Sequence, residues 1–276
     1  MSVRWLRTAI LMGLGLLATS LMFFPIYWLV VTSLKPTSEL FRRPPTFLPL
    51  HIDWTAYIVN VVQSPDLFRY IWNSAQLGLG TVLLSVGLGA PAAYALARLP
   101  LPGKNIFVLG VLMLQMFPGI MLAVPLYVMF SRLGLVNSLF AVSLAITTRT
   151  LPFAILMLRP FFLDLPQDLE EAAALDGCSS WGTFFKIFMP LSLPGLATVA
   201  AFNFLSGWSD FLFSLTLLTD DSKRPISMGL YRFISQYGVQ WNDLMAVSVV
   251  AAIPAVAVFF FAQRYLIAGL TVGADR

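Results

Sequence analysis

Long runs of mainly apolar residues dominate this chain. Six runs reach the roughly 20 residues that an α-helix needs to cross the hydrocarbon core of a membrane, and they cover residues 8–31, 70–97, 105–131, 137–162, 191–218 and 244–266. Backbone N–H and C=O groups cannot go unpaired in lipid, and the alternating pattern of a membrane β-barrel is absent. The pattern therefore predicts an all-α, polytopic protein with about six transmembrane helices, the first of them retained rather than cleaved.

Polar segments separate these runs and differ in character. Residues 34–69 form a long proline-rich connection, residues 98–104 a tight turn and residues 219–243 a further polar loop. Residues 164–190, called here the acidic segment, carry five carboxylates and one lysine. We expect one domain over residues 1–276, with a core at about residues 70–266 and the acidic segment as a loop beside it.

Composition removes the soluble alternatives. Hydrophobic residues make up 58% of the chain and charged residues 11%, whereas soluble domains carry about 25% charged residues. The mean hydropathy is +0.82. The net charge of +4 comes from scattered basic residues, without the cluster that nucleic-acid binding requires.

Few residues are available for catalysis. Cys178 is the only cysteine and His51 the only histidine, which argues against a disulfide, a metal centre or a nucleophile–base pair. Gly103-Lys104 is not a phosphate-binding loop, because Arg98 stands where that motif needs a glycine. We expect a chain that is not an enzyme and binds no cofactor itself.

The acidic segment predicts two short helices at the membrane surface. Asp168 suits the start of the first helix, and Glu170 and Glu171 complement the positive end of its dipole. Alanines at 172–174 favour a helix with little side-chain bulk, so another protein can approach closely. Gly177 suits the helix end.

A second helix follows directly. Ser179 or Ser180 can cap its start, and Pro190 is expected to close it before the next span. Its apolar anchors are Trp181, Phe184, Phe185 and Phe188.

The same stretch resembles the EAA loop of binding-protein-dependent ABC importer permeases. That loop reads Glu-Ala-Ala, three residues, Gly, nine residues, then Ile-x-Leu-Pro. The matching positions here are Glu171, Ala172, Ala173, Gly177, Ile187 and Pro190, with Met189 in place of the leucine. Residues 98–104, 115–118, 263–266 and 269–271 extend the resemblance to the shorter permease subunit of maltose-type sugar transporters.

The resemblance implies a type I ABC importer permease for a sugar, with a di- or oligosaccharide expected, in the bacterial or archaeal cytoplasmic membrane. The implied partners are a second permease, two ATPase subunits that hold ATP and Mg²⁺, and an extracytoplasmic sugar-binding protein. The residues expected to couple to the ATPase are Glu170, Glu171, Ala172, Ala173, Asp176, Gly177, Trp181, Phe184, Phe185, Ile187 and Pro190.

Charged residues inside the spans are candidates for the substrate pathway or for pairing with each other. Arg149 lies in the fourth run and Asp210 in the fifth, where an unpaired ion costs about 2.5–3.5 kcal/mol on insertion scales. We assign five residues to the substrate pathway: Gln115, Met116, Asn203, Trp208 and Asp210.

Two alternatives stay open at this point. Importers of glycerol phosphate or of another polar solute use permeases of the same type, and an ion-coupled secondary transporter is a further reading, although it would want paired carboxylates at mid-membrane. Lysines and arginines other than Arg149 divide evenly between the two sides, but those closest to helix ends favour cytoplasmic termini.

Overall fold

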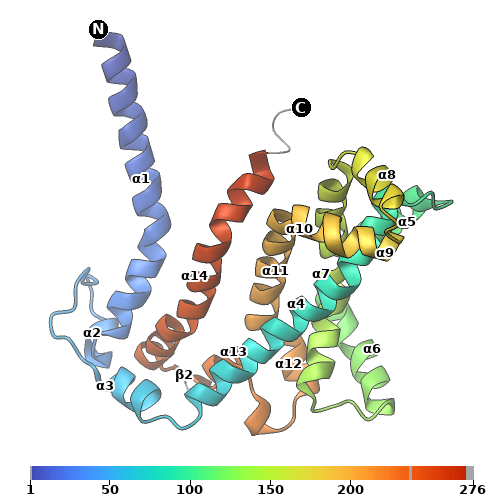
Figure 1. The fold of residues 1–276 in the computed structure, drawn as a ribbon. Helices are drawn as coiled ribbons and strands as arrows, with labels where there is room; N and C mark the ends of the chain where they lie inside the picture. Colours follow the sequence, from blue (N-terminus) through green and yellow to red (C-terminus); the bar gives the residue numbers. More distant parts are fainter. Residues whose placement is uncertain (1, 236–237, 272–276) are drawn as a thin grey trace. The chain divides into compact units, whose positions relative to one another are not determined.

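Helices make up most of the chain in a computed structural model that describes residues 2–235 and 238–271 (Figure 1). The orientation of the termini across the membrane stays a prediction. The elements in chain order are α1 (Ser2–Ser33), α2 (Thr37–Leu40), α3 (Thr55–Tyr57), η1 (Ile58–Val62), α4 (Leu67–Arg98), α5 (Lys104–Gln115), α6 (Gly119–Arg132), α7 (Leu139–Leu163), α8 (Asp168–Leu175), α9 (Ser180–Thr183), η2 (Phe184–Phe188), α10 (Met189–Leu191), α11 (Leu193–Trp208), α12 (Leu212–Leu217), η3 (Asp221–Lys223), α13 (Ile226–Tyr231), β1 (Ile234–Ser235), β2 (Gly238–Val239) and α14 (Trp241–Thr271).

The prediction of an all-α membrane protein is confirmed. Among the described residues, α1, α4, α7 and α14 are each long and apolar enough to cross a membrane. Two bent pairs, α5 with α6 and residues 180–191 with α11, bring the number of crossings to as many as six. The strands β1 and β2 add only a two-residue antiparallel ribbon, with Ile234 opposite Val239.

Two predicted spans are not continuous helices. The run at 105–131 divides into α5 and α6, which meet at 97°. Pro118 causes the break, because its backbone is extended (ψ 130°) at the start of α6 and a proline disfavours helical geometry in the residue before it. The run at 191–218 ends its long helix at Trp208 and resumes as the short α12.

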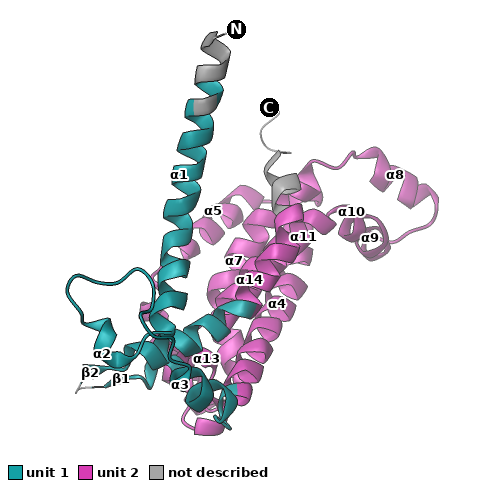
Figure 2. Cartoon of the chain, turned by 90° about the vertical axis from the view of Figure 1, so that its left-hand side faces the viewer, with its two compact units in different colours: residues 1–67, 230–253 teal, residues 68–229, 254–276 magenta. Residues whose placement is uncertain are grey.

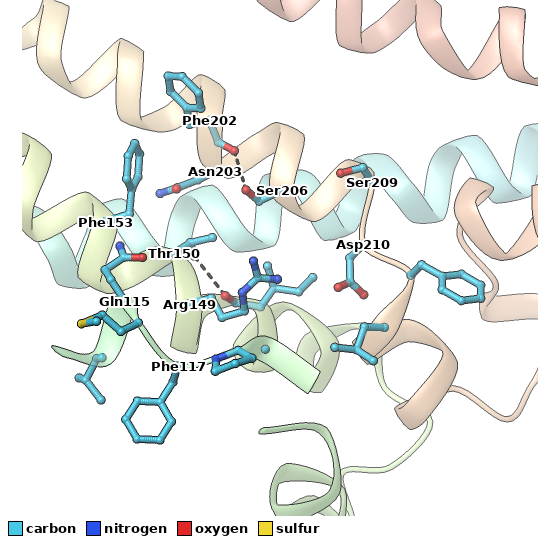
Figure 3. Close-up of a pocket in the computed structure, with 17 residues that line it drawn as sticks. Gln115, Phe117, Arg149, Thr150, Phe153, Phe202, Asn203, Ser206, Ser209 and Asp210 are labelled. Atoms are coloured by element: carbon cyan, nitrogen blue, oxygen red, sulfur yellow. Dashed lines mark hydrogen bonds between the residues drawn. The ribbon is translucent and has the colours of Figure 1, made fainter. Parts of the chain in front are cut away.

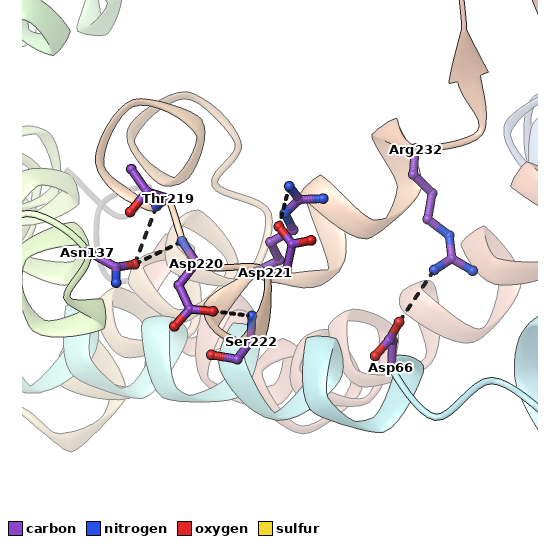
Figure 4. A network of polar contacts seen from close by, with 8 residues as sticks. Asp66, Asn137, Thr219, Asp220, Asp221, Ser222 and Arg232 are labelled. Atoms are coloured by element: carbon purple, nitrogen blue, oxygen red, sulfur yellow. Dashed lines mark hydrogen bonds and ion pairs between the residues drawn. The ribbon is translucent and has the colours of Figure 1, made fainter.

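The chain divides into two compact units, drawn in different colours in Figure 2. Unit 1 comprises residues 1–67 and 230–253, and unit 2 comprises residues 68–229 and 254–276. Inside unit 1, Asn60 Nδ2 donates to Asp243 Oδ1 at 2.7 Å. An ion pair of 4.0 Å between Asp66 and Arg232 (Figure 4) likewise joins the two sequence segments of this unit.

A buried glutamate holds the proline-rich connection of unit 1 in place. The Glu39 carboxylate accepts hydrogen bonds from the Thr46 hydroxyl and from the Leu50 backbone N–H, the latter at 3.1 Å. These bonds hold the pKa of Glu39 below its ordinary value, with the Thr46 bond as the main cause. Lys35 stands 4.8 Å from the Trp28 ring centre and donates to the Thr46 carbonyl.

Unit 2 contains two apolar cores, one toward each end of its helices. The first brings together α4, α5, α7, η2 and α11 around Tyr94, Phe162, Phe184 and Phe188. The second is built from α4, α6, α7 and α12, with Phe130 and Phe213 among its fully buried side chains.

Small residues let the helices of unit 2 approach closely, as the glycine-rich sequence of α4 suggests. A Cβ on Gly207 would lie 2.6 Å from the Leu77 carbonyl oxygen, and one on Gly80 would lie 2.6 Å from the Ser143 hydroxyl. Both glycines are therefore required by packing between helices.

The loop after α12 is fixed by Asn137, which adopts a left-handed backbone conformation (φ 63°). Its side-chain oxygen accepts from the backbone N–H groups of Thr219 and Asp220, at 3.3 and 3.1 Å (Figure 4). Asparagine tolerates this conformation better than most residues, so one side chain both turns the α6–α7 loop and anchors the loop that follows α12.

Candidate functional site

The acidic segment folds as the sequence predicts at its first helix. α8 begins at Asp168, and Gly177 has the left-handed φ of 79°. The Cys178 N–H donates to the Ala173 carbonyl at 2.8 Å and the Gly177 N–H to the Ala174 carbonyl at 3.1 Å. These two bonds form a Schellman motif, which satisfies carbonyls that the end of a helix leaves unpaired.

The second helix of the segment has its cap at Ser179. The Ser179 hydroxyl accepts from the Gly182 N–H at 3.2 Å, which decides between the two serines left open above. α9, η2 and α10 then follow one another directly to Leu191. The helical stretch ends at Leu191, one residue after Pro190, which agrees with the expected closure to within the precision of a helix boundary. The 80° bend toward α11 follows at Ser192.

The four predicted anchors divide into two pairs. Phe184 and Phe188 are buried and pack their rings against Tyr94, at 5.2 and 5.0 Å between ring centres. Trp181 and Phe185 stack on each other at 5.9 Å and remain 62% and 59% exposed. One pair therefore fixes the segment to unit 2, and the other is available to a partner.

The remaining predicted residues of the segment are mostly accessible. Glu171, Ala172, Asp176, Gly177 and Pro190 are exposed, Glu170 and Ile187 are half-buried, and Ala173 is buried. Leu175, which the sequence reasoning did not single out, is 90% exposed. No local pattern in the sequence signals this exposure. Figure 1 places α8 and α9 together at the end of unit 2 where α4 ends and α5 begins.

Arg98, at the end of α4, connects the acidic segment to two long helices. Its side chain donates to the backbone carbonyl of Phe162, in the last turn of α7, at 2.8 Å, and to that of Leu165, just after the end of α7. It also lies 3.8 Å from a Glu170 carboxylate oxygen and 5.0 Å from the Phe188 ring centre. The role of Glu170 is thus partly internal to this chain.

A cavity of about 580 Å³ opens at the break between α5 and α6. This volume is in the range of small-molecule sites, about 300–1,000 Å³. Its walls come from the α5–α6 junction, the middle of α7 and the end of α11 (Figure 3). The lining residues that carry aromatic or polar groups are Gln115, Phe117, Arg149, Thr150, Phe153, Phe202, Asn203, Ser206, Ser209 and Asp210.

The structure brings four of the five predicted pathway residues to this cavity. Gln115, Met116, Asn203 and Asp210 all line it. Trp208 does not; it is buried and stacks on Phe204, with 5.9 Å between ring centres. The sequence alone does not show whether a tryptophan near the end of a span lines a cavity or packs against other side chains inside the protein.

Arg149 and Asp210 share the cavity without the ion pair that their sequence positions suggest. No pair within 4.0 Å joins them in the described part of the chain. Asp210 Oδ2 instead accepts from the Ser214 N–H and hydroxyl, each at 2.9 Å, at the start of α12. This contact also explains why the predicted fifth span stops at Trp208.

Metal binding finds no support in residues 2–235 and 238–271, where no group of three or more histidine, cysteine, aspartate or glutamate side chains could hold an ion.

Comparisons with known proteins agree with these features. The arabinooligosaccharides transport system permease protein AraQ of Halalkalibacterium halodurans is 35% identical over 92% of this chain and 91% of that protein. The trehalose transport system permease protein SugB of Mycobacterium tuberculosis is 35% identical over 91% of this chain and 92% of that protein. A crystal structure of a bacterial ABC transporter involved in the import of the acidic polysaccharide alginate aligns with a TM-score of 0.78 at 22% identity, covering 95% of this chain and 96% of that chain.

The family described as "Binding-protein-dependent transport system inner membrane component" matches residues 85–272, which include both the cavity and the acidic segment. The chain therefore belongs to this family of membrane permeases.

Proposed function

We propose that this chain is one permease subunit of an ATP-driven importer for a di- or oligosaccharide. The sugar assignment is supported by relatives such as the arabinooligosaccharide and trehalose permeases, which align over more than nine tenths of the chain. The partners would be a second permease, two ATPase subunits that bind ATP and Mg²⁺, and an extracytoplasmic binding protein. Both termini would face the cytoplasm, and residues 1–276 would act as a single permease domain.

The coupling role is supported by a group of accessible residues on the acidic segment. We call this group the exposed set; it consists of Glu171, Ala172, Leu175, Trp181 and Phe185. Two stacked aromatic rings and a leucine are left in solvent beside a carboxylate. Exposed apolar groups of this kind, rimmed by polar residues, mark protein–protein contact sites. The alanines add a surface without bulk, so a partner can approach the α8 backbone.

An ATPase that moves against the exposed set would displace the transport helices through Arg98 and through the buried rings of Phe184 and Phe188. Arg98 joins the ends of α4 and α7, and Phe184 and Phe188 belong to the core that those helices share. Well-packed cores transmit displacement with little compression. A shift of α8 would therefore move α4 and α7, and α7 lines the cavity.

A charge reversal at Glu171 tests the proposal. Glu171→Lys should abolish ATP-dependent uptake in vesicles and reduce co-purification of the ATPase by at least about tenfold, because the Glu171 position is expected to face a basic residue of the ATPase. Asp221→Lys is the matched control: Asp221 is exposed on the loop after α12 and pairs with the nearby Arg224, a surface pair of small value. Normal uptake and ATPase retention in Glu171→Lys would refute the coupling role.

A further inference from the structure

Arg149 contributes an exposed positive charge to the lining of the cavity. It projects from the middle of α7 and is exposed (Figure 3). No described residue gives its guanidinium a hydrogen bond or an ion pair within 4.0 Å. An ionised group at this depth is costly unless it has a partner or faces water, and it marks a functional site by default.

Asp210 does not neutralise this cation by direct contact. Its carboxylate is buried and is committed to the first turn of α12 through the Ser214 N–H and hydroxyl. Its backbone carbonyl is also occupied, since the Ser227 hydroxyl donates to it at 2.5 Å. The accessible charge that lines the cavity is therefore positive.

The α5–α6 break makes room for the arginine. A Cβ on Gly119, the first residue of α6, would lie 2.8 Å from Arg149 Cδ and 3.1 Å from its Nε. Glycine at this position lets the arginine stem lie against the start of α6. The side chain is thus held along its length while its charged end stays accessible.

A second polar group of the cavity also lacks a partner. Asn203 is 1% exposed, and neither its side-chain nitrogen nor its side-chain oxygen has a hydrogen-bond partner among the described residues. A buried amide left unsatisfied costs about 1–3 kcal/mol. One donor and one acceptor from the same side chain suit a hydroxyl group of a ligand, which can both accept and donate.

Aromatic rings complete the wall. Phe153 and Phe202 pack edge to face at 5.5 Å between ring centres, and Phe117 lies at the helix break on the other side of Arg149 in Figure 3. The cavity therefore combines apolar faces, an unpaired amide and one exposed guanidinium. Such a guanidinium matches a carboxylate or phosphate through two parallel hydrogen bonds.

We propose that this cavity binds a polyhydroxylated substrate that carries an oxyanion, either a carboxylate or a phosphate, with Arg149 on the oxyanion and Asn203 on a hydroxyl group. This inference rests on the proposed import function and narrows its substrate class. A neutral sugar would offer the exposed Arg149 guanidinium no charged group to bind.

Matched probes can test the charge requirement. Equilibrium binding is measured with the complete importer, purified in lipid nanodiscs. The neutral probes are disaccharides of glucose, galactose and mannose, and each is compared with the corresponding diuronate. Glucose 6-phosphate beside glucose, and glycerol 3-phosphate beside glycerol, form the phosphate arm. At least one charged probe should bind about tenfold or more tightly than its neutral partner, the lower end of what hydrogen bonds to charged groups provide.

Variants then assign the preference to the residue. Arg149→Gln should bring the charged-to-neutral ratio close to one while leaving neutral binding intact, and Arg149→Lys should fall between the two because it keeps the charge without the planar fork. Asn203→Ala should weaken both members of a pair equally. Arg132→Gln, the same substitution at the exposed end of α6 away from the cavity, should change nothing.

Three results would overturn the inference. In the first, no charged probe binds better to the wild-type complex than its neutral partner does. In the second, the Arg149→Gln variant keeps the preference for the charged probe. In the third, the Arg149→Gln variant loses the second permease on purification, which would mean that the arginine pairs with protein. ATP-dependent uptake of a neutral saccharide by a wild-type complex that shows no preference for any charged probe would remove this inference and leave the import function standing. Loss of all ATP-dependent uptake in the wild type would remove both.

Discussion

Gly177 determines, at the scale of a single residue, how the two helices of the acidic segment are oriented. Its φ of 79° is costly for residues with a Cβ, by about 1–2 kcal/mol. Nothing within 4 Å would clash with a Cβ there, so a substitution tests backbone conformation and not crowding.

We expect Gly177→Val to turn α9 away from its present direction and to separate ATPase binding from membrane insertion. The variant should reach the membrane in normal amount but retain less ATPase on purification, with uptake reduced in proportion. Gly177→Asn is the matched control, because asparagine accepts the left-handed conformation. Equal ATPase retention in glycine and valine forms would show that the left-handed turn is not needed for coupling.

The stability of the loop at residues 46–50 should depend on pH through the single side chain of Glu39. Its pKa is held below the ordinary value chiefly by the Thr46 hydroxyl, so the ionised form favours the folded loop. That contribution is present above the unfolded value of about 4.3 and is lost as the pH falls through the lower, folded value. Hydrogen exchange at residues 46–50, corrected for intrinsic rates, should therefore rise on acidification below about pH 4.

Glu39→Gln separates this effect from general acid unfolding. The variant should show fast exchange in the same loop already at pH 7 and little further change on acidification, because it has no carboxylate to titrate. An acid response as large as that of the wild type would assign the effect to another group.

Single residues also show where sequence reasoning succeeds. Gly177 and the serine cap at 179 follow from local rules, since each satisfies backbone groups within a few residues of itself. Leu175 and Arg149 depend on what surrounds them in space. Their exposure is set by elements far along the chain, and no local pattern contains it.

Elements show the same division between local and non-local information. Hydropathy locates the helices well because lipid accepts only long apolar stretches with internally paired backbones. It does not register the break between α5 and α6, since Met116 to Pro118 are as apolar as the helices beside them. The proline is visible in the sequence, but whether it kinks a span or divides it by 97° depends on packing.

Arg98 provides a prediction for the contact between elements. Its guanidinium satisfies the Phe162 carbonyl in the last turn of α7, where the helix itself supplies no donor. Arg98→Gln should leave buried carbonyls unpaired at about 1–3 kcal/mol each, which should lower the thermal midpoint of the complex and speed hydrogen exchange across residues 164–191.

Glu170→Gln is the comparison that makes this test specific. The Arg98–Glu170 contact is long, at 3.8 Å, and Glu170 is partly exposed, so a small loss is expected. Equal destabilisation by the two variants would mean that the ion pair, and not the bonds to the Phe162 and Leu165 carbonyls, holds the acidic segment.

At the scale of the whole molecule, membrane topology follows from single crossings in unit 2. α7 has 25 residues, which at about 1.5 Å per residue exceed the roughly 30 Å hydrocarbon core. We therefore expect its two ends to lie on opposite sides of the membrane. The Asn137 bonds keep residues 219–220 beside the first residues of α7, and the acidic segment follows its last.

This topology makes a labelling prediction that does not depend on substrate or partner identity. In a Cys178→Ser background, a cysteine at Ser180 should react with a membrane-impermeant maleimide only after the cells are opened, whereas a cysteine at Thr219 should react in intact cells. Both positions are exposed, so a difference in labelling reports sidedness rather than burial. Labelling of Ser180→Cys from outside would reverse the orientation and place the exposed set away from any cytoplasmic ATPase, while labelling of both positions from one side would mean that α7 does not cross the membrane at all.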